Sequence, residues 1–323
     1  MTRPDPAYPA NDDPTCIVVD WGTTSFRAAL VTQDGRTLDR TETPEGIQNI
    51  PDRSYEPVLM RALGKWFVAH GPLPVLALGM ITSKTGWVEV PYVTCPASPA
   101  DLAGGTISLE LSNGAPLIFL AGLTDPARKP YADVMRGEET QIMGFGLDRD
   151  TVVILPGTHS KWARLRGGAI DSFQTFVTGE IFALLTQHSF IARSAGPASG
   201  KTDWGAFQRG LDLTSAADGT ADAFLSLLFS ARTGMLFGHL SAGEVRDYVS
   251  GLVIGHEFRE ARSQDWFTAG DSVGMVGNDG LNMRYTKAAQ TFGLSVIDGG
   301  ENAAVLGAIA LIGGLSRGKL GPA

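Results

Sequence analysis

Two segments of the chain read alike and limit what it can fold into. Residues 16–31, CIVVDWGTTSFRAALV, and residues 151–166, TVVILPGTHSKWARLR, both have a short apolar run, a Gly-Thr turn and an alternating second run. At constant spacing, Gly22, Thr23, Ser25, Ala28 and Leu30 fall on Gly157, Thr158, Ser160, Ala163 and Leu165. Shared turn chemistry in a shared strand context favours a duplication over chance matching. Two similar halves facing each other could hold one ligand between their turns.

The rest of the chain alternates strand-like and helix-like segments. Apolar runs at 74–80 and 116–122 predict buried strands, whereas 55–69 and 136–147 have helical spacing. This alternation predicts an α/β protein with mixed sheets flanked by helices. A chain of 323 residues exceeds one ordinary core. We expect a disordered tail, two domains and a last helix that packs back on the first domain, with bounds 1–15, 16–125, 126–300 and 301–323.

The first Gly-Thr turn, Asp20-Trp-Gly-Thr-Thr-Ser, ends a buried run with an acid. A carboxylate there lies at the sheet edge where ligands bind in open α/β sheets. Asp20 is therefore predicted to hold Mg²⁺, mainly through water, because Mg²⁺ is reluctant to shed its hydration shell. Gly22 lets the backbone approach a phosphate, and the remaining candidate phosphate contacts are Thr23, Thr24 and Arg27. The alternative is a simple hairpin with an Asp-started turn.

The second turn, Pro156-Gly-Thr-His-Ser-Lys161, repeats the donors without the acid. Gly157 and Thr158 are predicted to bind phosphate alone, with Lys161 adding a positive charge. His159 has no partner nearby in the sequence, so we interpret it as a structural donor and leave it out of the site.

A third small-residue segment, Thr268-Ala-Gly-Asp-Ser272, follows the apolar pair Trp266-Phe267. If that pair ends a strand, the small residues admit a flat ring against the backbone. Gly270, Asp271 and Ser272 are therefore the candidate adenosine site. An ordinary strand-to-helix turn is the alternative.

The charge balance excludes some partners. The net charge of −8 argues against a general nucleic-acid or anionic-membrane binder. Two cysteines form no disulfide framework, and the Pro- and Asp-rich start lacks the apolar core of a signal peptide. We expect a cytoplasmic protein without nucleic-acid or membrane partners. A homodimer is left open.

The order of these motifs resembles the ATPase core of sugar kinases, hexokinase, actin and Hsp70. More specifically, the chain resembles the 2-dehydro-3-deoxygalactonokinase family in VDWGTTSFRA (19–28), SKTGWVEVPY (83–92), MRGEETQIMG (135–144), LPGTHSKW (155–162) and FVTGE (176–180). The resemblance implies a two-domain actin-like (ribonuclease H-like) ATPase fold with ATP and Mg²⁺ in a central nucleotide cleft. It also implies a phosphotransferase with an alcohol acceptor, acting on the 6-hydroxyl of 2-dehydro-3-deoxy-D-galactonate in galactonate breakdown.

The resemblance also suggests where the catalytic base lies. Related sugar kinases have Gly-Asp at a helix start before the second turn, and this chain has Gly137-Glu138-Glu139. Adjacent helix residues point about 100° apart, so one of the two acids should face the substrate. We prefer Glu138, with Asp171 next in line, and expect the helix start to lower the pKa of the base.

Other residues of these segments are candidates for binding the substrate. Arg136 is expected to pair with the carboxylate of a sugar acid. Ser83, Gly86 and Trp87 form either a substrate-side loop or a packed aromatic corner.

Three other functions remain open at this point. The chain could be a kinase of another sugar or sugar acid, or a non-catalytic sugar-responsive regulator. Ala195–Thr202 nearly matches a Walker A loop, which would indicate a P-loop NTPase. A Walker loop must follow a buried strand, and the residues before Ala195 have little strand character.

Overall fold

The computed structural model describes residues 13–195, 200–215, 224–300 and 302–314. These residues form two compact units, one running to Gly146 and resuming at Asn302, the other running from Leu147 to Gly300. The predicted boundary after residue 125 is therefore too early. Most of the expected tail lies outside the described residues, as do residue 301 and residues 315–323 of the predicted last helix.

The first unit is built on a six-stranded mixed sheet with the order β3-β2-β1-β4-β7-β6. Strand β1 (Cys16–Trp21) pairs antiparallel with β2 (Phe26–Val31) and parallel with β4 (Val75–Leu78). The other strands are β3 (Thr37–Thr43), β6 (Ile107–Glu110) and β7 (Pro116–Phe119). Helix α1 (Tyr55–His70) packs Leu59 and Leu63 into the core of the first unit.

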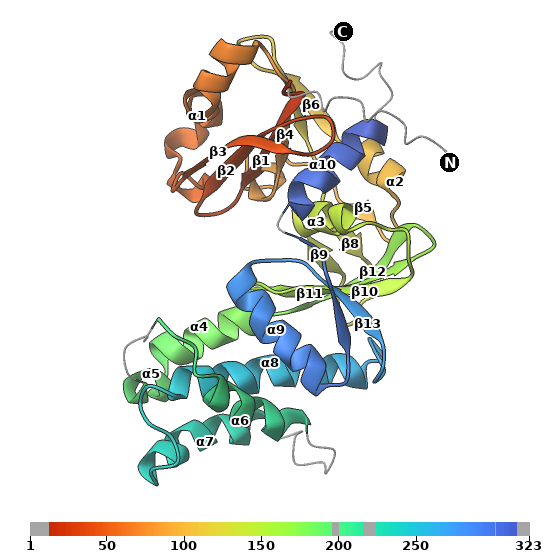
Figure 1. Cartoon of the computed structure of the whole chain (residues 1–323). Helices are drawn as coiled ribbons and strands as arrows, with labels where there is room; N and C mark the ends of the chain where they lie inside the picture. Colours follow the sequence, from red (N-terminus) through yellow and green to blue (C-terminus); the bar gives the residue numbers. More distant parts are fainter. Residues whose placement is uncertain (1–12, 196–199, 216–223, 301, 315–323) are drawn as a thin grey trace, which may run out of the picture. The chain divides into compact units, whose positions relative to one another are not determined.

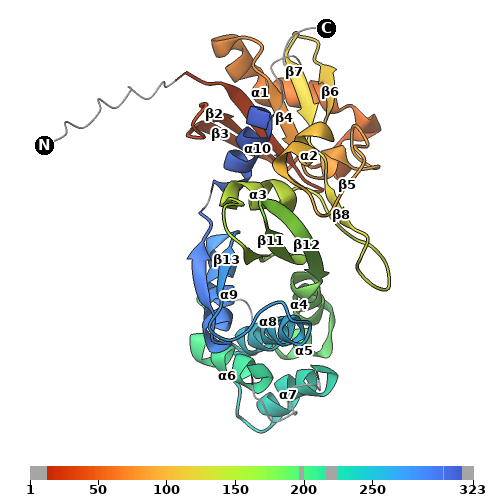
Figure 2. The same ribbon diagram turned by 90° about the vertical axis from the view of Figure 1, so that its right-hand side faces the viewer.

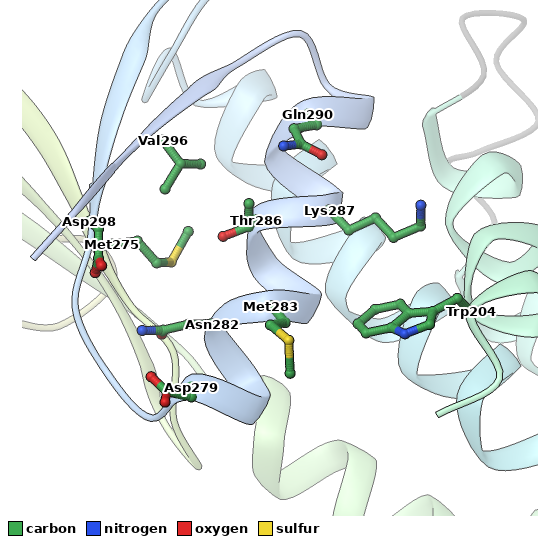
Figure 3. Close-up of a pocket in the computed structure, with 10 residues that line it drawn as sticks. All are labelled: Trp204, Met275, Asp279, Asn282, Met283, Thr286, Lys287, Gln290, Val296 and Asp298. Atoms are coloured by element: carbon green, nitrogen blue, oxygen red, sulfur yellow. The ribbon is translucent and has the colours of Figure 1, made fainter. Parts of the chain in front are cut away.

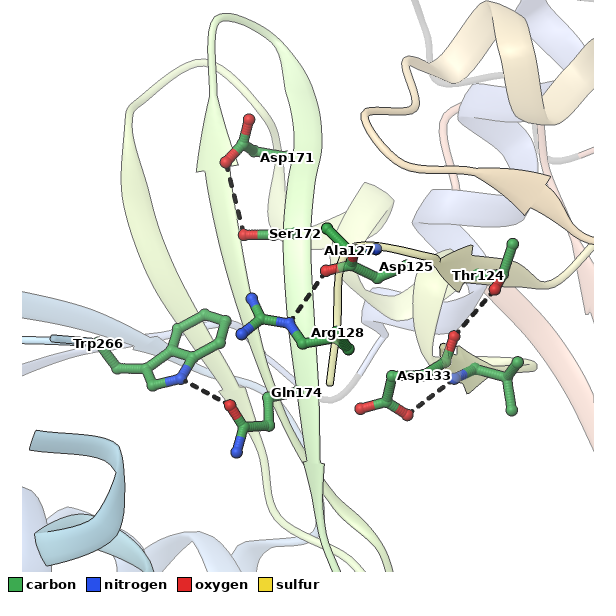
Figure 4. Close-up of polar contacts among 10 residues, drawn as sticks. Thr124, Asp125, Ala127, Arg128, Asp133, Asp171, Ser172, Gln174 and Trp266 are labelled. Carbon is green, nitrogen blue, oxygen red and sulfur yellow. Dashed lines mark hydrogen bonds and ion pairs between the residues drawn. The ribbon is translucent and has the colours of Figure 1, made fainter. Parts of the chain in front are cut away.

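A small second sheet explains the shift of the boundary. It consists of β5 (Val93–Thr94), β8 (Leu123–Asp125) and β9 (Asp133–Met135), and the Thr124 hydroxyl donates to the Asp133 carbonyl across β8 and β9 (Figure 4). Residues after 125 are thus paired within the first unit. Helix α2 (Pro99–Gly104) and three short 3-10 helices, at 47–49, 51–53 and 80–82, complete the connections.

Helix α3 (Glu138–Phe145) packs against α10 (Ala303–Gly314), far away in the sequence (Figure 1). The two helices are in backbone contact, because a Cβ on Gly307 would lie 1.7 Å from the Thr140 carbonyl oxygen. The last helix therefore supports the helix that begins with both candidate base residues.

The second unit repeats the arrangement of the first. Its sheet has the order β12-β11-β10-β13-β14, which matches β3-β2-β1-β4-β7 strand for strand. The strands are β10 (Thr151–Leu155), β11 (Ser160–Arg166), β12 (Ala169–Phe176), β13 (Ser272–Met275) and β14 (Ser295–Asp298). The predicted α/β class with duplicated mixed sheets is confirmed.

The spacing of the two halves is not constant after the turns. Asp20 lies opposite Arg27 on the return strand, and Leu155 lies opposite Lys161. The structural counterpart of Arg27 is therefore Lys161, and the predicted match of Ala28 with Ala163 is one residue out. In both units, the return strand after the turn thus carries a basic residue opposite the residue at or next to the end of the first strand.

The helices of the second unit lie together on one side of this sheet (Figure 2). They are α4 (Thr178–His188), α5 (Phe190–Ser194), α6 (Trp204–Ser215), α7 (Phe224–Leu236), α8 (Val245–Ser263) and α9 (Asp279–Thr291). Trp162, Phe258 and Phe267 form the centre of an aromatic core. Among the described helices, none combines the length and apolar character needed to cross a bilayer.

Candidate active site

The carboxylate of Asp20 is partly buried at the end of β1. Burial raises its pKa, the charge of Arg27 lowers it, and the charge of Glu138 raises it again. A Cβ on Gly79 would lie 2.9 Å from Asp20 Oδ1, so the glycine after β4 leaves room beside this oxygen. Arg27 itself is exposed and forms an ion pair with Glu42 at 2.9 Å.

Backbone hydrogen bonds from residues 47 and 48 fix the turn that follows Asp20. The amides of Ile47 and Gln48 donate to the carbonyls of Gly22 and Thr23, at 3.0 and 3.2 Å. The hydroxyl groups of Thr23 and Thr24 make no hydrogen bond to any residue that the structure describes. Phosphate binding by Thr23 and Thr24 stays a prediction.

The two glutamates at the start of α3 have different environments. Gly137, with φ 111°, turns the chain from β9 into α3. Glu139 is buried, and both of its oxygens accept from the Gly137 amide, at 2.7 and 3.0 Å. Burial raises its pKa to about 7, with the charge of Glu138 as the second cause. The expected lowering of the pKa at a helix start is therefore wrong for Glu139, because desolvation outweighs the amides.

Glu138 is only partly buried and is close to both other acids. Its Oε2 accepts from the Arg136 amide at 3.1 Å. Its charge raises the pKa of Asp20 as well as that of Glu139. The structure thus brings Asp20 and Glu138 together at one edge of the first sheet, and leaves Glu139 underneath.

Arg136 has a structural task that the sequence did not reveal. Its Nη1 donates to the carbonyl and hydroxyl oxygens of Thr82, both at 2.7 Å, and its Nη2 donates to the Val90 carbonyl at 2.9 Å. The guanidinium also lies over the Tyr92 ring, 4.2 Å from its centroid. These donors hold the 82–92 loop, while the pairing of Arg136 with a substrate carboxylate stays a prediction.

The predicted substrate loop is a packed corner. Ser83 donates to the Met80 carbonyl at 2.7 Å, and a Cβ on Gly86 would lie 2.2 Å from the Ile81 carbonyl oxygen. Trp87 stacks on Tyr55 with centroids 6.0 Å apart. Of the two predicted roles for Ser83, Gly86 and Trp87, the structure favours the aromatic corner.

The second turn, Pro156–His159, is built on the start of α4. Gly179 packs against it, because a Cβ there would lie 2.4 Å from the Gly157 carbonyl oxygen, and the Glu180 amide donates to the Thr158 carbonyl at 3.0 Å. The Thr158 hydroxyl, like those of Thr23 and Thr24, makes no hydrogen bond within the described residues. The side chain of Lys161 is buried beneath the turn, with Nζ 3.4 Å from the His159 carbonyl oxygen.

His159 has a partner that sequence reasoning missed. Its Nε2 lies 2.6 Å from Glu180 Oε2, and both side chains are half exposed. The partner is in FVTGE, a segment noted only for its family resemblance. The sequence did offer two signals for this pair: Glu180 is an acid at a predicted helix start, and His159 is a histidine in a turn without a partner nearby in the sequence.

The candidate adenosine residues lie at the wrong edge of the second sheet. Strand β13 runs parallel to β10, with Val152 opposite Val273. Gly270, Asp271 and Ser272 come at the beginning of β13, whereas the Gly157 turn follows the end of β10. Asp271 and Ser272 line a cavity of about 430 Å³ at that opposite edge. The predicted adenosine site is therefore incorrect in position.

A larger cavity, of about 830 Å³, lies on the correct edge (Figure 3). Its wall includes Met275 at the end of β13, Asp298 at the end of β14 and one face of α9, which contributes Asp279, Asn282, Met283, Thr286, Lys287 and Gln290. Gly277 lies between this cavity and the second turn. A Cβ there would lie 2.9 Å from Oδ1 of Asn282, which lines the cavity, and 3.5 Å from the Pro156 carbonyl oxygen. The carboxyl ends of parallel strands are where open α/β sheets bind ligands.

Two further expectations concern the second unit. Asp171 accepts from the Ser172 hydroxyl at 3.4 Å on β12 (Figure 4), near the Gly167-Gly168 end of the hairpin, away from Ser160. It is therefore no alternative base near the second turn. The Walker-like segment lies partly outside the described residues, and the helix α5 precedes it in place of a strand.

Comparisons with known proteins identify the family of the chain. The model of the 2-keto-3-deoxy-galactonokinase family matches residues 20–311. A probable 2-dehydro-3-deoxygalactonokinase of Rhizobium meliloti (strain 1021) is 33% identical, over 86% of this chain and 90% of its own length. The 2-dehydro-3-deoxygalactonokinase of Escherichia coli (strain K12) is 31% identical, over 87% and 91%.

A solved structure shows the same fold. The crystal structure of a candidate 2-dehydro-3-deoxygalactonokinase from Sinorhizobium meliloti has a TM-score of 0.81 and 30% sequence identity, and the match covers 94% of this chain and 99% of that one. With the family model spanning both Gly-Thr turns and both candidate base residues, the chain belongs to the 2-keto-3-deoxy-galactonokinase family.

Proposed function

We propose that the protein transfers the γ-phosphoryl group of ATP to the 6-hydroxyl of 2-dehydro-3-deoxy-D-galactonate. The hydroxyl oxygen forms a bond to the γ-phosphorus, the bond to the β,γ-bridging oxygen breaks, and ADP leaves. Glu138 accepts the hydroxyl proton. Such transfers depend on positioning and charge neutralisation more than on covalent chemistry.

The observation that carries the proposal is that Asp20 and the Gly137-Glu138 helix start both lie against Gly79, in a chain of this kinase family: a Cβ on Gly79 would lie 2.9 Å from Asp20 Oδ1, and one on Gly137 would lie 3.5 Å from Gly79 Cα. A metal-binding acid and a proton acceptor are needed close together for a phosphoryl transfer to an alcohol. Glu138 is better suited than Glu139 as the base, because Glu139 is buried and both of its oxygens share the Gly137 amide.

Mg²⁺ would suit the first turn. Asp20 and Glu138 are close enough for the charge of one to raise the pKa of the other, so a divalent cation beside them would relieve a repulsion. Mg²⁺ commonly takes one or two carboxylates and completes its shell with water and substrate phosphates. When bound, the ion would neutralise charge on the transferring group.

In the second unit, the Gly157 turn would contact phosphate and the 830 Å³ cavity would take the adenosine. The cavity has the volume of a ligand site and lies beside the turn through Gly277. Lys161, buried under the turn and equivalent to Arg27, would support the His159 end of that turn.

A matched pair of substitutions tests which edge of the second sheet binds the adenosine. Thr286→Trp should fill part of the 830 Å³ cavity and raise KM for ATP by about tenfold or more, with a smaller effect on KM for the sugar acid. Ser272→Trp places the same side chain in the 430 Å³ cavity and should leave KM for ATP within about twofold. Steady-state kinetics with both substrates varied would show this. The reverse pattern would restore the Gly270–Ser272 assignment.

The substrate is tested by an ATP-coupled screen. We expect turnover of 2-dehydro-3-deoxy-D-galactonate to exceed that of glucose or galactose by at least about a hundredfold, because a site that binds a carboxylate rejects analogues that lack it. Other 2-keto-3-deoxy sugar acids test the stereochemical preference. Equal rates on neutral hexoses would point to a general sugar kinase, and the position of the new phosphate can be read by ³¹P–¹H NMR.

A further inference from the structure

A buried carboxylate below the second turn has no part in the chemistry proposed above. Glu257, on α8, is 3% exposed. Its Oε1 accepts from the Ser160 hydroxyl and the Trp162 indole, both at 2.7 Å, and its Oε2 accepts from the Tyr285 hydroxyl at 2.6 Å. Thr178 also donates a side-chain hydrogen bond to it.

The donors around Glu257 come from separate elements. Ser160 directly follows the Gly157 turn, Thr178 opens α4, and Tyr285 lies on α9, the helix that lines the 830 Å³ cavity. All of these side chains are buried. The carboxylate is thus the common acceptor that fixes the turn, the helix beneath it and the wall of the cavity relative to one another.

Burying the carboxylate of Glu257 is costly unless every one of its hydrogen-bond donors is in place. Burial raises the pKa of Glu257, while the hydrogen bonds from Thr178, Tyr285, Trp162 and Ser160 lower it. An apolar side chain would fill the same space without desolvating a carboxylate, but it would leave several buried donors without an acceptor. A hydrophobic residue at this position would therefore neither satisfy these donors nor orient the turn.

We propose that Glu257 is a positioning residue for ATP, which holds the Gly157 turn in its phosphate-binding conformation through Ser160 and Thr178. The inference rests on the proposed function of that turn. Since Glu257 is buried below the turn and the proton acceptor is assigned to Glu138, its loss should weaken ATP binding more than it slows the chemical step.

Glu257→Gln is the informative variant. The amide oxygen can still accept from Ser160 and Trp162, and the Tyr285 hydroxyl can reverse and accept from the new NH₂ group. We expect it to fold, to raise KM for ATP by about tenfold, the equivalent of one or two weakened hydrogen bonds, and to leave KM for the sugar acid within about twofold. Glu260→Gln, an exposed position on the same helix, is the matched control and should match the wild type.

Direct ADP binding, measured by calorimetry on the full chain, separates this inference from the proposed function. If the wild type binds ADP and Glu257→Gln binds it equally well with only a lower Tm, Glu257 is merely structural and the inference is overturned. If the wild type neither binds ADP nor turns over, the proposed function fails first. Should Glu257→Gln not fold, Ser160→Ala gives the same test, because it removes the bond between the turn and Glu257 and should raise KM for ATP similarly.

Discussion

Replacing Asp20 by Asn should reduce kcat by at least about a hundredfold to a thousandfold, with a folded protein. The substitution keeps the shape of the side chain and removes the charge that would hold Mg²⁺ at the Gly22 turn. It also removes a partly buried carboxylate whose pKa is already raised by burial and by Glu138, so stability should not fall. Steady-state kinetics at saturating ATP and Mg²⁺, together with thermal melting, would measure both effects.

Asp34→Asn is the matched control for Asp20. Asp34 is an exposed acid in the turn between β2 and β3, within the same meander as Asp20. It should leave kcat within about twofold, because a surface substitution outside the site rarely perturbs function. An Asp20→Asn variant with near-normal kcat and an unchanged requirement for Mg²⁺ would sink the metal assignment.

Glu138→Gln and Glu139→Gln should behave differently, although the residues are adjacent. Without its proton acceptor, Glu138→Gln should lose about two to four orders of magnitude in kcat, with a small change in KM. Glu139→Gln keeps an oxygen that can accept from the Gly137 amide, so it should lose far less activity. Kinetics of both variants at a fixed pH would show whether the two acids divide their roles in this way. Equal, mild losses in both would send the search for the base elsewhere.

The stability of the wild type relative to Glu139→Gln should depend on pH in a defined direction. The pKa of Glu139 is raised from 4.5 to about 7 in the folded protein, so between these values the folded state binds more protons than the unfolded chain. The free energy of unfolding of the wild type therefore falls as pH rises through this range. Relative to Glu139→Gln, which does not titrate there, the wild type should lose at most about 3 kcal/mol. A wild type that gains stability relative to Glu139→Gln as pH rises would contradict the assignment.

The architecture and the first turn could be predicted from the sequence because local chemistry determined them. Apolar runs of strand length, interrupted by Gly-Thr turns, predict the hairpins β1–β2 and β10–β11 wherever they lie in the chain. The sites of Asp20, Gly22 and Gly157 follow from strand ends, which the sequence marks with turn residues. The match between the return strands β2 and β11 was one residue out, because the second turn is one residue shorter than the first. No apolar residue inside the turns marks this difference.

The candidate adenosine residues were misplaced for a different reason. Trp266 and Phe267 are apolar and buried, so they resemble the end of a strand, but they pack into the aromatic core without pairing. The strand is SVGM, residues 272–275, which is short and has two small residues. Two adjacent aromatic residues predict burial, but they do not predict that the segment pairs as a strand.

Arg136 and the 83–87 loop show the limit of reasoning from residue type. A guanidinium beside a candidate base is suited to a carboxylate, and nothing local reveals that carbonyls of residues 82 and 90 will use its donors. Those contacts depend on how the loop packs, which is a tertiary property. The same holds for Glu257, whose partners come from three other parts of the chain.

The contact between α3 and α10 affects the order in which the first unit can form. The segment that carries Glu138 is supported by a helix that begins only at Ala303, after the entire second unit. During synthesis, the second unit can fold as a continuous stretch, while the first must keep an open place for α10 until that stretch has passed. The nascent chain therefore carries Asp20 and Glu138 long before it has the helix that supports α3, and we expect a catalytically competent first unit only after this last helix has been made.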